Sequence, residues 1–285
     1  MNTVKVPELL KGPWEHVLFV TYGADIPFYE NALRPQLSPS CRNQIILADG
    51  ERFLEACSNY AKNGLARYLN QQYVASGIFV PQSAHAKLIL LTNSTRGRLL
   101  VGSGNLGWQG YASGGELFTH YEFSEDDPGS LAAFTAVREF LEHQLSLDLL
   151  SAMATRRVNH LFENTPWLFQ TPAIDDRPVR HNMEQSFIEQ LQIEIGEEPV
   201  HELWVMSPFF DRNACALSEL LSTFQPSKTV LLFQDRHTSV DPQELERTIS
   251  DLGREVEVRL FEPDGDDHFY VHAKLYLFRL GGRAV

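Results

Sequence analysis

The stretch His85–Leu91 has the sequence HAKLILL, and it returns almost unchanged near the other end of the chain as His272–Phe278, HAKLYLF. The chain contains only six lysines, so chance poorly explains two histidines that each have a lysine two residues later in the same apolar context. Side chains two residues apart in a β-strand point to the same face. We therefore expect two strands, each with a histidine and a lysine facing one side. A core or edge histidine bonded to the backbone would be the favoured explanation of one such pair, but the duplication favours a functional pocket.

Other apolar runs match between the two halves in the same order, which predicts a duplicated α/β unit. The matched runs are His16–Tyr22 with Glu202–Ser207, Gln44–Asp49 with Thr229–Asp235, and Gly77–Pro81 with Arg259–Pro263. Helices are predicted at Glu51–Leu69, Leu131–Leu150, Asn182–Ile195 and Asp241–Leu252. The expected fold class is α/β, with two repeated α/β/α units that have mixed, mostly parallel sheets and are related by a pseudo-twofold axis.

Three segments are expected along the chain. Residues 1–160 form the first half, and residues 201–285 form the second. Between them, residues 161–200 are predicted to be a connecting segment and a helix, because three prolines interrupt the pattern within Thr165–Arg180.

The composition is that of a folded, soluble protein. Of the 285 residues, 43% are hydrophobic and 21% are charged, which excludes bulk disorder. No apolar stretch reaches the roughly 18 residues of a membrane span, and the N-terminus lacks the apolar run of a signal peptide. Three scattered cysteines, Cys41, Cys57 and Cys215, form no metal-ligand spacing and predict a reducing, cytoplasmic location.

The net charge of −13 is unevenly distributed. Residues 1–110 hold ten Lys/Arg against seven Asp/Glu, whereas the rest of the chain holds fourteen against thirty. No acid occurs between Ala56 and Gly115. The cations in that window are Lys62, Arg67, Lys87, Arg96 and Arg98. A local positive field suits a phosphate-handling site, although composition alone can also produce such a window.

A strand ending in Gly102-Ser103-Gly104-Asn105 follows the first histidine–lysine pair. It would bring a hydroxyl, an amide and unhindered backbone N–H groups to one point, where they suit an oxyanion. The same residues are common in ordinary strand-to-turn transitions. Their position after the histidine–lysine pair favours the functional interpretation.

These residues together resemble the HKD motif of the phospholipase D superfamily. The matching residues are His85, Lys87, Ser103, Asn105, Glu116 after a glycine pair, His272 and Lys274. Leu203–Asp211 (LWVMSPFFD) is similar to the strand-plus-proline entry of these proteins. The resemblance spans nearly the whole chain, and Thr21–Phe28 (TYGADIPF) is most similar to a nuclease-like, defence-associated prokaryotic branch found beside helicases.

The resemblance implies phosphodiester hydrolysis without metal or other cofactor, through a phosphohistidine. It implies His85 as the nucleophile and His272 as the acid, although the sequence presents the same pair in both halves. Lys87, Lys274 and Asn105 would hold the non-bridging oxygens, Ser103 would help to orient them, and Glu116 would set the tautomer of a histidine. The implied partner is nucleic acid, most of all DNA. A helicase or ATPase, as partner or fused domain, and a homodimer are further expected associations, and no membrane is expected.

The chain departs from the family pattern at the motif's aspartate, which is Thr92 in the first copy and Arg279 in the second. This departure disfavours a lipid phospholipase and fits divergent nucleases or phosphodiesterases. A phospholipid phosphodiesterase or transferase, and a non-catalytic binding or scaffold module, remain the alternatives.

The second copy also stops early. With Gly282–Val285 aligned to Gly97–Leu100, the counterparts of Ser103 and Asn105 would fall near positions 288–292. We therefore expect a second unit that is truncated here or continues beyond Val285.

No metal centre is expected. The sequence has no His-Glu-x-x-His, no carboxylate cluster around the motif and no paired cysteines. Magnesium requires oxygen ligands, which the acid-free window does not supply.

Overall fold

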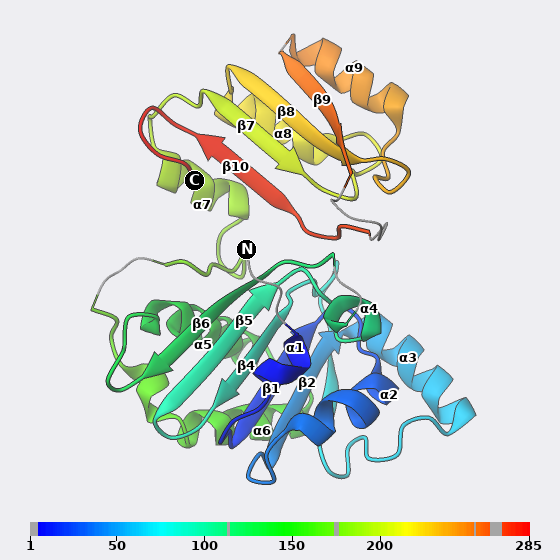
Figure 1. Ribbon diagram of the computed structural model, residues 1–285, viewed down its shortest axis with the longest axis vertical. Helices are drawn as coiled ribbons and strands as arrows, with labels where there is room; N and C mark the ends of the chain where they lie inside the picture. The colour runs from blue at the N-terminus through cyan, green and yellow to red at the C-terminus, as the bar shows by residue number, and fades with distance from the viewer. Residues whose placement is uncertain (1–4, 113–114, 174–176, 254, 263–269) are drawn as a thin grey trace. The chain divides into compact units, whose positions relative to one another are not determined.

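The computed structural model describes residues 5–112, 115–173, 177–253, 255–262 and 270–285. The contacts between residues divide the chain into two compact units (Figure 1). The first consists of Met1–Ser113 and Leu117–Met183, and the second of Gly114–Glu116 and Glu184–Val285. Each unit is an α/β body with a mixed sheet.

The first unit contains a six-stranded sheet in the order β3-β2-β1-β4-β5-β6. Its strands are β1 (His16–Thr21), β2 (Asn43–Asp49), β3 (Val74–Ile78), β4 (Leu88–Thr92), β5 (Arg96–Gly102) and β6 (Phe118–Ser124). Strands β1, β2 and β3 are parallel, whereas the pairs β1–β4, β4–β5 and β5–β6 are antiparallel. The expectation of a mostly parallel sheet is therefore wrong for this unit. A short turn between Thr92 and Arg96 returns the chain alongside β4, and a longer connection that includes α4 (Trp108–Tyr111) leads from β5 to β6.

Helices cover both faces of the first sheet. Along β1, Leu18 and Val20 point to one apolar cluster while Val17 and Phe19 point to the other, as strand alternation requires. The first cluster includes side chains from α5 (Leu131–Ser146) and α6 (Ala152–Glu163), and the second from α1 (Val6–Leu9), α2 (Ile26–Phe28) and the π-helical turn η1 (Tyr29–Leu33). In Figure 1, α1 and α2 lie in front of this sheet and α5 and α6 behind it. The remaining helices are η2 (Arg34–Gln36), α3 (Gly50–Asn63), α4 (Trp108–Tyr111) and the 3-10 turn η3 (Pro166–Phe169).

Part of the segment expected to connect the units belongs to the core of the first. Trp167, in η3, is buried, stacks on Phe123 at 4.1 Å between ring centroids, and donates its indole N–H to the Asn93 carbonyl. Pro166 therefore begins a turn that closes the first core.

The second unit repeats one part of the first sheet. Its strand order is β10-β7-β8-β9, with β7 (Glu202–Met206), β8 (Lys228–Gln234), β9 (Val256–Phe261) and β10 (Leu275–Arg279). Strands β7, β8 and β9 are parallel and β10 is antiparallel to β7. These strands correspond to β1, β2, β3 and β4, so the predicted duplication is present in the pairing pattern itself. Ala284 bridges to Arg279 in the same way as Gly97 pairs with Thr92, so Ala284 is the equivalent of Gly97. The sequence alignment of Gly282 with Gly97 is therefore wrong by two residues.

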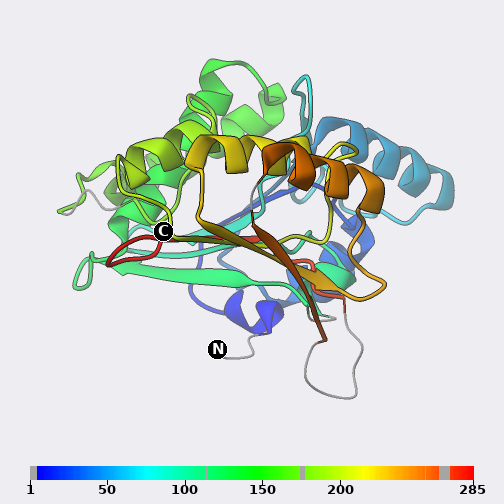
Figure 2. The ribbon, with the colours of Figure 1, turned by 90° about the horizontal axis from the view of Figure 1, so that it is seen from above.

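Helices of the second unit gather on one face of its sheet. Side chains from α7 (Phe187–Ile195), α8 (Cys215–Phe224) and α9 (Pro242–Leu252) share one cluster with Leu203, Val205 and Phe278. Figure 2 shows these three helices on the same side of the strands. Residues that alternate with this cluster, such as Trp204 and Leu277, point to the opposite face, and Leu277 is 39% exposed.

Among the described residues, no helix combines the length and the apolar character that a membrane crossing would need.

Candidate active site

Both histidine–lysine pairs lie immediately before a strand and not within one. Strand β4 begins at Leu88, which pairs with Val20, and β10 begins at Leu275, which pairs with Met206. The expectation that the pairs occupy strand positions is wrong because β1 and β7 end where the pairs begin, so no neighbouring strand is left on that side. Lys87 is still held to β5, since its carbonyl accepts from the Gly102 N–H at 3.2 Å.

Within each pair, the lysine folds back onto its own histidine. Lys87 Nζ donates to the His85 carbonyl at 3.0 Å and lies 3.0 Å from His85 Nδ1. Lys274 Nζ donates to the His272 carbonyl at 2.9 Å and lies 2.9 Å from His272 Nε2. The ammonium of Lys87 is buried, with 7% of the residue exposed. The same local turn therefore brings a positive charge against an imidazole twice in the chain.

An aromatic side chain lies beside each pair, and the sequence analysis missed both. The Tyr22 ring is 4.7 Å from the His85 ring between centroids and 5.8 Å from Lys87 Nζ. In the second unit the Phe209 ring is 5.7 Å from the His272 ring and 5.4 Å from Lys274 Nζ. Contact of a cation with an aromatic face stabilises the charge of each lysine by about 0.5–2 kcal/mol. In the sequence, Tyr22 follows the apolar run of β1 and Phe209 follows that of β7, and this position is the signal that could have identified them.

Ser103 and Asn105 reach the same sheet edge as His85 and Lys87. Ser103 Oγ accepts from the Leu117 N–H at 3.0 Å, and Asn105 Oδ1 accepts from the Gly23 N–H at 3.4 Å. Since the oxygen of the Asn105 amide is used by the protein, its Nδ2 group is the part suited to donate to a ligand. The first unit thus brings together four of the predicted residues.

Glu116 clusters with the second unit, together with His272 and Lys274. Its Oε1 lies 3.0 Å from His272 Nδ1, and the His272 backbone N–H donates to the Gly115 carbonyl at 2.8 Å. The side chains of His272 and Glu116 are only 15% and 10% exposed. Glu116 thus lies against one ring nitrogen of His272, and Lys274 Nζ lies against the other.

Burial lowers the pKa of Lys274, and the Glu116 carboxylate partly opposes this by raising it. Burial of Tyr270 raises the pKa of its phenol, and its ring is 5.7 Å from the His272 ring. The surroundings of His272 are therefore partly dehydrated, which strengthens charge–charge interactions with a bound anion.

Among the residues that the structure describes, no group of three or more His, Cys, Asp or Glu side chains is placed to hold a metal ion.

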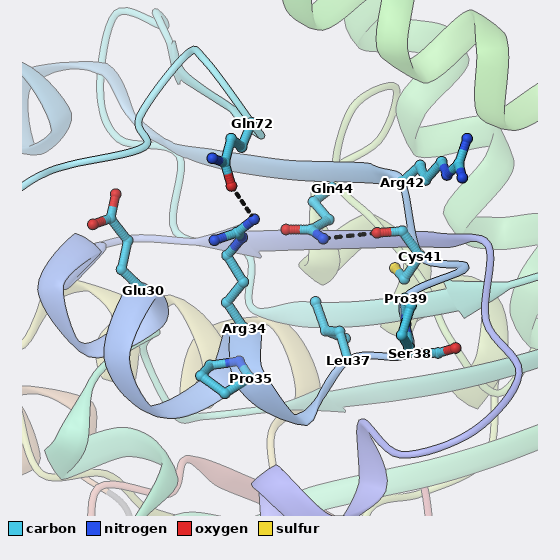
Figure 3. A pocket seen from close by; sticks show the side chains of 10 residues that line it. All are labelled: Glu30, Arg34, Pro35, Leu37, Ser38, Pro39, Cys41, Arg42, Gln44 and Gln72. Carbon is cyan, nitrogen blue, oxygen red and sulfur yellow. Dashed lines mark hydrogen bonds between the residues drawn. The ribbon is translucent and has the colours of Figure 1, made fainter.

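A separate pocket of about 540 Å³ lies in the first unit and contains none of the motif residues (Figure 3). Gln44, near the start of β2, lines it, whereas the motif residues of this unit lie near the end of β1. Its buried Glu30 accepts hydrogen bonds from the N–H groups of Arg67 and Tyr68 and from the Tyr73 hydroxyl. Burial raises the pKa of Cys41 in this pocket to about 12, which disfavours the thiolate form. The polar groups of this pocket serve to hold chain segments together.

The chain is similar to the crystal structure of the yeast tyrosyl-DNA phosphodiesterase, with a TM-score of 0.54, 9% identity, and coverage of 98% of this chain and 78% of that one. The fold is that of the phospholipase D superfamily. The phospholipase D-like chain is also similar to the polyphosphate kinase from Porphyromonas gingivalis, with a TM-score of 0.47, 14% identity, and coverage of 98% of this chain and 42% of that one. No family model and no curated protein matches the sequence.

Proposed function

We propose that this phospholipase D-like chain is a metal-independent phosphodiester hydrolase that acts on nucleic acid through a phosphohistidine. The observation that carries the proposal is the repetition of one local arrangement, an imidazole with its lysine ammonium within about 3 Å, in two units of different sequence. Each pair places an ammonium group beside an imidazole, and charged donors of this kind are suited to the non-bridging oxygens of a phosphodiester.

The reaction needs two imidazoles with different tasks. His85 Nε2 attacks phosphorus and forms an N–P bond while the P–O bond to the leaving group breaks, and His272 donates a proton to that oxygen. Water then attacks phosphorus, gives its proton to His272, and the N–P bond breaks. The sum is one phosphodiester and one water converted to a phosphomonoester and an alcohol.

The other predicted residues stabilise charge in this scheme. Lys87 and Lys274 neutralise the non-bridging oxygens, Asn105 Nδ2 donates to one of them, and Ser103 holds the loop through Leu117. Glu116 acts on His272, whose Nδ1 it holds. This contact supports a role for Glu116 in setting the tautomer and in stabilising the imidazolium that forms.

Nucleic acid, with DNA first, is the proposed substrate because residues 1–110 carry more Lys/Arg than Asp/Glu in a chain that is acidic as a whole. The similar yeast protein is named as a tyrosyl-DNA phosphodiesterase, which supports the same choice. One cation of the acid-free window is already used, since Arg98 pairs with Glu122 at 2.7 Å. Antiviral defence or DNA processing in a cytoplasm, with a helicase or ATPase as partner, is the biological setting that we propose.

The decisive experiment is trapping of the intermediate. The full chain is mixed with a ³²P-labelled oligonucleotide phosphodiester and quenched, and the protein should carry a label that is stable in alkali and lost in acid. The label should be absent from His85→Ala. If it persists there and disappears only in another histidine variant, the nucleophile is reassigned, and if no histidine variant removes it, the mechanism is wrong.

Substrate class and metal use are tested in the same assay. We expect turnover of DNA to continue in excess EDTA, whereas recovery by added magnesium after its loss would contradict the metal-independent mechanism. Phosphatidylcholine vesicles serve as the competing substrate. Faster cleavage of the lipid than of DNA would favour a phospholipid phosphodiesterase, and binding of DNA without any turnover would favour a scaffold.

A further inference from the structure

A buried side chain at the end of the second strand of each unit binds the chain just before the proposed catalytic histidine. In the first unit, Asp49 Oδ2 accepts from the Ala84 N–H at 2.9 Å. In the second, Gln234 Oε1 accepts from the Val271 N–H at 2.8 Å. Ala84 and Val271 directly precede His85 and His272.

The two acceptors occupy equivalent positions. Asp49 is the last residue of β2 and Gln234 is the last residue of β8, and these are the strands parallel to β1 and β7. Both are buried, with 5% and 7% of the residue exposed. The same contact has therefore been kept in both units with different side chains, which points to the contact itself as the requirement.

The difference between aspartate and glutamine has a physical reason. Asp49 serves two N–H groups, because its Oδ1 also accepts from Arg52 N at 3.1 Å and caps α3. A carboxylate supplies two acceptor oxygens, whereas an amide supplies one. In the second unit a turn follows β8, and α9 has its own cap in Asp241. One acceptor oxygen therefore suffices in Gln234.

We propose that Asp49 and Gln234 are positioning residues that set the location of His85 and His272, an inference that rests on the proposed function. Residues 79–87 and 270–274 have no regular secondary structure, so ladder hydrogen bonds do not fix their path. A fixed N–H one residue before the imidazole restricts where its ring can lie. Displacement of a reacting group by about 1 Å can cost about 10²-fold in rate.

The test compares Gln234→Leu, which removes the acceptor at similar volume, with Gln234→Glu, which keeps one. For the full chain acting on a DNA phosphodiester, we expect kcat to fall about 10–100-fold in Gln234→Leu, with KM little changed, and to recover in Gln234→Glu. Both are assayed well below their Tm. Unchanged kcat in Gln234→Leu, or an equal loss in both variants, would overturn the proposal.

A variant of the first unit separates the contact from the helix cap. Serine can cap α3 but, with one short hydroxyl, cannot also reach Ala84, so Asp49→Ser should lower kcat by a similar factor while far-UV circular dichroism stays the same. Full activity in Asp49→Ser would contradict the role of Asp49.

Amide hydrogen exchange distinguishes failure of this inference from failure of the proposed function. The Val271 amide should exchange at least about tenfold faster in Gln234→Leu than in Gln234→Glu, whether or not the chain turns over DNA. Accelerated exchange without any turnover would leave the contact standing and reject the function. Unchanged exchange would reject the positioning role.

Discussion

In the first unit, β5 and β6 extend the sheet and helices cover both faces, whereas in the second unit the described helices all pack on one face of four strands. The histidine–lysine turn is nevertheless the same in both units. Its geometry therefore depends on what the units share, namely a strand that ends beside the pair, an aromatic residue after that strand and an acceptor from the next one. The second helical layer contributes stability and is not needed to form the turn.

Substitution of the two histidines should have the largest effect on turnover, and it should distinguish the two units most clearly. His85→Ala should abolish turnover of both DNA and a nitrophenyl phosphodiester, because no N–P bond can form. His272→Ala should lose DNA cleavage but retain more nitrophenyl ester cleavage, since a good leaving group needs little protonation. Steady-state rates on the two substrates measure the difference. The reverse pattern would show that His272 is the nucleophile, a role that its Glu116-held Nδ1 would also suit.

Matched leucine truncations test whether the face of the second sheet opposite its helices is exposed to solvent. Leu90 and Leu277 occupy equivalent positions in β4 and β10, but Leu90 is 1% exposed and Leu277 is 39% exposed. We expect Leu90→Ala to lower the free energy of unfolding by about 2–5 kcal/mol and Leu277→Ala by about 1 kcal/mol or less. Urea unfolding measures both. A large loss in Leu277→Ala would mean that this face is covered in solution.

A buried histidine distinguishes the first strands of the two units and predicts sensitivity to acid. His16 is 2% exposed, and burial, with a smaller effect of His160, lowers its pKa from 6.5 to about 4. Below pH 6.5 the His16 imidazole is protonated in the unfolded chain but stays neutral in the folded chain, so the free energy of unfolding falls as the pH falls toward 4. The loss should reach about 3 kcal/mol.

The control for this prediction removes the imidazole. His16→Gln should lose less stability than the wild type between pH 7 and pH 4.5 in urea unfolding. The equivalent residue in the second unit, Glu202, pairs with Arg279 at the surface. Glu202→Gln should therefore lose about as much stability between pH 7 and pH 4.5 as the wild type does. An equal loss of stability in the wild type and in His16→Gln would exclude His16 as the cause.

The smallest expected effect concerns the lysine of the second unit. Its ammonium is active when charged and is lost as the pH rises through its pKa, which burial lowers and Glu116 raises. Glu116→Gln should therefore move the alkaline limb of kcat/KM to lower pH, by about one unit or less. Lys274→Arg, which stays charged, should remove this limb wherever it retains activity. If the alkaline limb of kcat/KM stays at the same pH in both variants, it reports the titration of a group other than Lys274.

Several features could be predicted from the sequence because they depend on local patterns. The apolar runs around β1, β2 and β8 located those strands, and Asp241 with Pro242 located the start of α9. Strand β6 was missed because its exposed Thr119, His120 and Glu122 hide the apolar signal. Helix α6 was also missed, although its buried Ala154, Val158 and Leu161 follow the i, i+4, i+7 spacing of an amphipathic helix.

The sequence by itself determined that the chain carries one motif twice, since the repeat of histidine, lysine and the apolar strand after them is visible without any contact. Only the tertiary structure decided where each pair lies, just before its strand, because that depends on where β1 and β7 end. It also decided that Glu116 holds His272 and that Asp49 and Gln234 have the same task. These contacts join residues far apart in the chain, and different side chains can supply the same acceptor oxygen, so no spacing in the sequence reveals them.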